Sequence, residues 1–139
     1  MHRIVLVSVS LLFITIFVNS SYSAGSTPQA RVFFTEPMDK MTVSSPVKVT
    51  MGAENFTIEP AGTVKEAAGH FHIMVDTDCV EVGQVIPKDD THLHYGKGQT
   101  EAQLTLSPGS HTLCLQAGNG AHIALPGNGL TQKITIEVK

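Results

Sequence analysis

Histidine is the residue type in this sequence whose number and spacing could carry chemistry. The chain has 139 residues and seven histidines, and six of the seven lie between residues 70 and 122. Four of these six form two His-x-His pairs, and another follows a glycine-rich stretch. The candidate metal ligands are His70, His72, His92, His94 and His122. Imidazole is a common protein ligand for zinc and copper, so the pattern predicts a transition-metal site, copper before zinc.

The spacing within each pair suits a β-strand. Side chains two residues apart on a strand project from the same face, with their backbones about 7 Å apart. His70 and His72 therefore share the face opposite Phe71 and Ile73, where both imidazoles can approach one ion. Three other interpretations stay open for these histidines: an exposed polar face, hydrogen bonds to backbone carbonyls, or contact with an organic ligand.

His111 is set apart from the five candidate ligands. It follows a Ser-Pro-Gly-Ser turn and shares a strand face with Leu113 and Leu115. Many Greek-key sandwiches place a tyrosine at such a corner, with its polar tip bonded to the turn behind it. We expect His111 to have this structural role and the two leucines to lie in the core.

Motifs of the common enzyme classes are absent from the sequence. It has no G-x-S-x-G or H-E-x-x-H motif, no phosphate-binding glycine loop and no dinucleotide fingerprint. We therefore expect no catalytic residue and no nucleotide or organic cofactor. A metal-dependent redox or oxygenase-type activity is the enzymatic alternative.

The charge balance argues against nucleic acid as a partner. Nine Lys and Arg stand against 12 Asp and Glu, which gives a formal net charge of -3, and the basic residues form no cluster. Such a chain lacks the cluster of positive charge that attracts nucleic acid or an anionic membrane surface.

Residues 1–23 have the pattern of a secretory signal peptide. A basic start is followed by an apolar run at residues 4–18 and by small polar residues. Cleavage is expected after Ser23, with Ala24 as the alternative. The apolar run is shorter than the roughly 20 residues that span a bilayer. We therefore expect a periplasmic or secreted protein whose mature form has no membrane span.

The sequence has two cysteines, Cys79 and Cys114. In an oxidising compartment the simplest expectation is that they form a disulfide, and two separate buried thiols are the alternative. A bond that closes a loop of about 35 residues would stabilise the fold by a few kcal/mol in the chain-entropy model.

After a flexible linker at residues 24–30, residues 31–139 predict one all-β domain. Short runs with apolar residues at alternate positions are separated by glycine and proline. We expect a single immunoglobulin-like, Greek-key antiparallel β-sandwich, with one helical turn at residues 65–68. The predicted strands cover residues 31–35, 47–51, 55–59, 70–76, 100–106, 111–116 and 130–138.

Several strings of this sequence resemble one bacterial family. The most specific are H-L-H-Y-G-K-G-Q-T-E at residues 92–101 and L-S-P-G-S-H-T-L-C-L-Q at residues 106–116. They resemble exported domain-of-unknown-function family 4399, whose members are sometimes labelled rod shape-determining proteins, a label that nothing here supports. The family often has H-H-H in the first histidine cluster, where this chain has Phe71 in the middle. The resemblance implies export and brings no established chemistry.

Two functions from different classes follow. The first is an exported module that buffers or delivers a metal ion, with a metal donor or acceptor protein as its partner. The second is a non-metal structural or interaction domain of the cell envelope, which would hold a partner through a sandwich face or through the loop at residues 95–100.

Overall fold

The structure is a computed structural model that describes residues 28–139. The predicted signal peptide, and the linker up to residue 27, lie outside the described residues. Within the described part the chain forms strands and loops and no helix. The strands are β1 Arg31–Glu36, β2 Thr42–Val43, β3 Val47–Glu54, β4 Thr57–Ile58, β5 Ala68–Val75, β6 His92–His94, β7 Glu101–Leu104, β8 Gly109–Gly118 and β9 Thr131–Val138.

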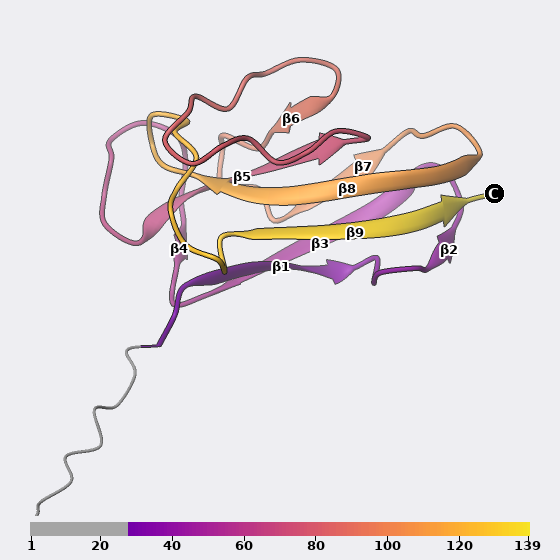
Figure 1. The fold of residues 1–139 in the computed structure, drawn as a ribbon, viewed down its shortest axis with the longest axis horizontal. Helices are drawn as coiled ribbons and strands as arrows, with labels where there is room; N and C mark the ends of the chain where they lie inside the picture. The colour runs from indigo at the N-terminus through magenta and orange to yellow at the C-terminus, as the bar shows by residue number, and fades with distance from the viewer. Residues whose placement is uncertain (1–27) are drawn as a thin grey trace, which may run out of the picture.

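Two sheets pack face to face (Figure 1). The smaller has the order β1-β3-β7, and the larger has the order β2-β9-β8-β5-β4, with β6 also paired to β5. The long ladders are antiparallel, whereas the two-residue pairings of β2 with β9 and of β4 with β5 are parallel. The predicted all-β sandwich is therefore confirmed, and two short parallel pairings at its edges accompany the antiparallel ladders.

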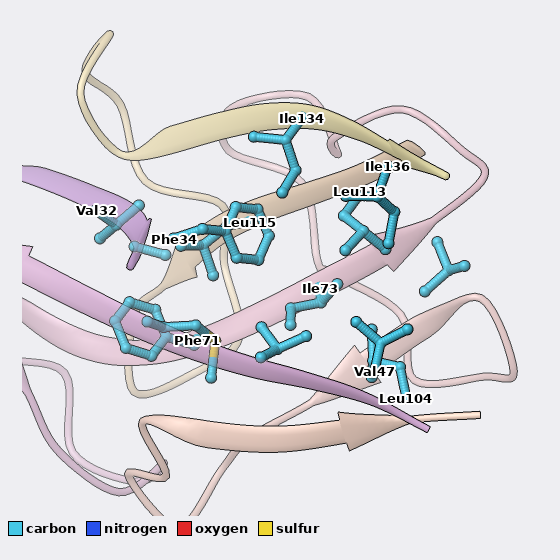
Figure 2. Close-up of a cluster of buried hydrophobic side chains, with 14 of the residues drawn as sticks. Val32, Phe34, Val47, Phe71, Ile73, Leu104, Leu113, Leu115, Ile134 and Ile136 are labelled. Atoms are coloured by element: carbon cyan, nitrogen blue, oxygen red, sulfur yellow. The ribbon is translucent and has the colours of Figure 1, made fainter. Parts of the chain in front are cut away.

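Alternating apolar residues from both sheets build the core between them. Figure 2 shows their side chains pointing toward one another from the facing strands. Phe71 and Ile73 of β5 are fully buried there, as are Leu113 and Leu115 of β8. Burying each of these large side chains stabilises the fold by about 1.5–3 kcal/mol relative to leaving it exposed. The alternation that predicted these strands also predicted which face of each strand enters the core.

β5 is buried on both of its faces. Phe71 and Ile73 enter the main core, while Met74 lies on the opposite face in a second apolar cluster with Ile86, Cys114 and Ala124. This second cluster is covered by the connection from β5 to β6, which lies on the side of the larger sheet away from β1 and β3 (Figure 1). Polar side chains on the outer face of β5 are therefore buried as well.

The helical turn expected at residues 65–68 is wrong. Glu66 and Ala67 form a turn, with Ala67 at a φ of 48°, and Ala68 already begins β5. The Ala67 carbonyl accepts a hydrogen bond from the amide of Thr57 at 2.8 Å. Pairing with β4 therefore overrides the local helix propensity of this alanine-rich segment.

The predicted disulfide between Cys79 and Cys114 is formed, across a separation of 35 residues. Cys114 lies on β8 and points away from the core that Leu113 and Leu115 enter. The bond fixes the start of the β5–β6 connection to the middle of the larger sheet.

His111 occupies the corner position expected for it. Its Nε2 donates to the carbonyl of Ser107 at 2.8 Å, and its Nδ1 donates to the carboxylate of Asp76 at 2.7 Å. Both partners can only accept, so this position favours the doubly protonated, positively charged ring. The hydrogen bond to Asp76, followed by that to Ser107, raises the pKa of His111.

We expect this imidazolium to make the fold less stable as the solution becomes alkaline. Because the pKa of His111 is higher in the folded than in the unfolded chain, its contribution is complete below about pH 6.5 and is lost as the pH rises through the folded-state value. Thermal unfolding of wild type and of His111→Gln between about pH 6 and 9 checks this. A melting temperature that falls equally in both proteins would contradict it.

Candidate metal centre

Four histidine rings converge on the outer face of the larger sheet. His70 and His72 come from β5, His94 from β6 and His122 from the turn after β8. Their ring centroids lie 4.7–6.1 Å apart. The Nε2 atoms approach in two pairs, His70 with His72 at 3.0 Å and His94 with His122 at 3.1 Å. The structure thus brings together four of the five ligands that the sequence predicted.

Strand register places three of these rings. Alternation along β5 puts His70 and His72 on the face opposite Phe71, where both are fully buried. In the antiparallel β5–β6 ladder His94 stands directly opposite His72. Side chains at opposite positions of such a ladder are neighbours. The pairing of His72 with His94 therefore brings the first His-x-His motif next to the second.

A tight turn places the fourth ring. His122 has a φ of 64°, a left-handed conformation that costs energy for a residue with a side chain. Asn119 stabilises this turn, because its side-chain oxygen accepts from the amides of Ala121 and Ile123 at 2.9 and 3.0 Å. The Asn119 carbonyl also accepts from the amide of His122 at 2.9 Å. Sequence reasoning missed Asn119, although the Asn-Gly stretch before His122 is a turn signal.

Two glycines leave room for the rings. A Cβ on Gly96 would overlap the ring of His94, and a Cβ on Gly118 would lie 2.9 Å from Nε2 of His72. Gly96 belongs to the H-L-H-Y-G-K-G-Q-T-E string. This string therefore contains both the candidate ligand His94 and the glycine that leaves space for its ring. The sequence carried this signal, but its meaning depends on a contact that only the fold reveals.

His92 lies apart from the four converging rings. Its Nδ1 is 2.8 Å from the carboxylate of Asp89, and the same carboxylate oxygen accepts from the backbone amides of Thr91 and His92. The hydrogen bond from His92 is the largest cause that holds the pKa of Asp89 below its usual range. The structure therefore gives His92 a local role in shaping the chain before β6 and does not bring it to the other candidate ligands.

Burial keeps the rings of His70 and His72, the two inner histidines on β5, neutral. Burial, with the neighbouring histidines as the next cause, lowers the pKa of His72 to about 3 and that of His70 to about 4. Burial also lowers the pKa of His94, followed by the charges of His122 and Lys88. A metal ion binds only the neutral imidazole, so at neutral pH these nitrogens need not lose a proton before they bind.

The nitrogen spacing is compatible with a metal ion. Within residues 28–139, ligand atoms of His70, His94 and His122 lie within 4.8 Å of one another, with no carboxylate in the group. Two nitrogens about 2.0–2.1 Å from a tetrahedral ion are about 3.3 Å apart. The paired Nε2 atoms, at 3.0 and 3.1 Å, lie close to that spacing. His72 is not one of the group of three, and its link to the group is the Nε2 of His70.

The comparisons with known proteins identify a family. Searches of curated proteins and of solved structures give no match. Among the described residues, no helix has the length and apolarity needed to cross a membrane. The family model of a domain of unknown function, DUF4399, matches residues 49–139, a range that includes every histidine of the cluster. This match covers more than half of the chain, which therefore belongs to the DUF4399 family.

Proposed function

We propose that this protein binds a transition-metal ion, copper before zinc, through His70, His72, His94 and His122. The observation that carries the proposal is the approach of four imidazoles whose Nε2 atoms pair at 3.0 and 3.1 Å. Two of these rings, His70 and His72, are fully buried. Among the described residues, the only hydrogen-bond neighbour of each of the four Nε2 atoms is another histidine nitrogen, an arrangement suited to a metal ion. The module buffers the ion or delivers it, and its partner is a metal donor or acceptor protein.

The ligand type supports copper before zinc, and the spacing is compatible with both. A site made of neutral nitrogens follows the general order of divalent affinities, in which copper exceeds zinc. Adjacent nitrogens in a square-planar copper(II) site about 2.0 Å from the ion would be about 2.8 Å apart, and in a tetrahedral site about 3.3 Å. The Nε2 spacings within the two pairs lie between these two values, so each pair is compatible with either geometry.

We also propose that the protein is exported, as a periplasmic or secreted domain. The basic and apolar pattern of residues 1–23 is that of a secretory signal. A disulfide between Cys79 and Cys114 supports the same location, since such bonds persist in oxidising compartments. The proposed activity is binding, and no catalytic residue is part of it.

Metal titration tests the proposal. We expect Cu(II), Cu(I) and Zn(II) to bind wild type in competition with a chelator of known affinity. His70→Ala/His72→Ala should lose at least about 100-fold in affinity, because two ligands of one ion are removed. His92→Ala is the matched control and should bind as wild type does, because its ring pairs with Asp89. Equal affinities in wild type and the double variant would rule the metal site out and leave the interaction domain as the alternative.

A further inference from the structure

The inner two histidines lack the outer partners that usually orient metal ligands. A metal-bound histidine generally donates its second ring N–H to a carboxylate, a carbonyl or water. The Nδ1 atoms of His70 and His72 are buried and have no hydrogen-bond partner among the described residues. The orientation of these two rings must therefore come from packing.

Residues 79–86 of the β5–β6 connection, here called the roof segment, supply part of that packing. Ile86 is 3% exposed. A Cβ placed on Gly118 would lie 3.2 Å from Cδ1 of Ile86 and 2.9 Å from Nε2 of His72, so both side chains crowd the same point of β8. The amide of Ile86 also donates to the carbonyl of His122 at 2.8 Å. The roof segment thus contacts the surroundings of an inner ligand and the backbone of an outer one.

A buried amide side chain fastens the roof segment to the sheet. Gln116 is 1% exposed and stands directly opposite His72 in the β5–β8 ladder. Its Oε1 accepts from the amide of Val80 at 2.9 Å, and its Nε2 donates to the carbonyl of Val80 at 2.8 Å. These two hydrogen bonds satisfy both polar groups of the glutamine side chain and hold the roof segment next to the proposed metal ligands.

The disulfide fastens the same segment covalently. Cys79 begins the roof segment, and Cys114 stands opposite Met74, two residues along β5 from His72. Both cysteines lie in or against the second apolar cluster with Ile86. Two different anchors, one covalent and one a pair of hydrogen bonds, therefore hold residues 79 and 80 to adjacent outward-facing positions of β8.

We propose that the roof segment positions the histidine rings for metal binding, and that the Cys79–Cys114 disulfide locks it so that reduction weakens binding. The inference rests on the proposed function. A dithiol reductant would supply two electrons and two protons: the S–S bond breaks, two thiols form, and the reductant becomes a cyclic disulfide. Gln116 then remains as the anchor of Val80, and the packing of Ile86 beside His72 loosens.

A disulfide-free variant tests the lock without adding thiols that bind copper. We expect Cys79→Ala/Cys114→Ala to bind Cu(II) about 10–100-fold more weakly than oxidised wild type, the usual effect of losing groups that support metal ligands. The electron paramagnetic resonance spectrum of the bound Cu(II) should also change, because a released ring no longer contributes its nitrogen. A loss of global stability alone would leave that spectrum unchanged.

Gln116→Leu tests the positioning role with the disulfide intact. It removes both hydrogen bonds to Val80, and we expect weaker Cu(II) binding and a changed spectrum here too. Gln132→Leu is the matched control: it removes a comparable bond, from the amide of Phe34 to the Gln132 side chain at 2.6 Å, without touching the roof segment. It should bind Cu(II) as wild type does.

The outcomes separate the two proposals. Wild-type affinity and spectrum in the folded roof variants would overturn the role of the roof segment while leaving the metal site in place. If the disulfide-free variant does not fold, Gln116→Leu decides. Wild type that binds no more tightly than His70→Ala/His72→Ala would overturn the proposed function itself.

Discussion

Saturating Cu(II) is expected to raise the melting temperature of the wild-type protein by about 10–20 °C. A ligand that binds only the folded state at 1,000 times its dissociation constant stabilises that state by about 4 kcal/mol. For a domain of this size each kcal/mol corresponds to about 4 °C. We expect a large effect because two of the four proposed ligands lie on β5, the strand whose two faces are both buried. The proposed site is therefore formed only in the folded state.

Differential scanning calorimetry with and without metal measures this shift. Addition of a strong chelator should return the melting temperature to the metal-free value. The His70→Ala/His72→Ala variant should show no metal-dependent rise, while His92→Ala should retain it. An equal rise in the double variant and in wild type would mean that the metal acts elsewhere on the chain.

Without metal, we expect the fold to lose stability steeply as the pH falls below about 6.5. His70 and His72 have folded-state pKa values of about 4 and about 3, whereas an unfolded histidine titrates near 6.5. Between these values the unfolded chain binds more protons than the folded one, so stability increases with pH and is lost on acidification. Each such group changes the free energy of unfolding by at most about 1.4 kcal/mol per pH unit.

Urea unfolding of the chelator-treated protein between about pH 6.5 and 5 isolates this effect, because most carboxylates stay ionised in that range. His70→Gln/His72→Gln, whose buried side chains do not titrate, is the control and should give a flatter curve. A wild-type curve as flat as that of the control would contradict the neutral, buried state of these rings. The sign is opposite to that expected for His111, whose contribution is lost toward alkaline pH.

Local pattern was sufficient to predict half of the site. Alternation along residues 70–76 placed His70 and His72 on one face and Phe71 in the core, because the side-chain period of a strand is a local property. The same reasoning placed His111 at its corner, since the acceptor in the turn behind it is only four residues away. The disulfide between Cys79 and Cys114 could also be predicted, because the chain has two cysteines and its expected compartment is oxidising.

The rest of the site depends on long-range geometry. His94 reaches the cluster through the register of β5 with β6, and His122 through a left-handed turn that Asn119 stabilises. Neither follows from residue spacing. The exclusion of His92 could have been anticipated, because Asp89 two residues before Thr91 is a typical start for a turn in which the carboxylate bonds the following backbone amides.

The two Nε2 pairs sit on parts of the chain that differ in how readily they open locally. His70 and His72 belong to an interior strand that has β8 on one side and β4 and β6 on the other, so they separate only when the sandwich unfolds. His94 and His122 belong to a three-residue strand and a turn, elements that open at a lower free energy. His70 and His72 therefore form the more stable half of the proposed site, and His94 and His122 the half that opens more readily. For the proposed metal site we therefore expect the ion to exchange with a partner from the side of His94 and His122 while the domain stays folded.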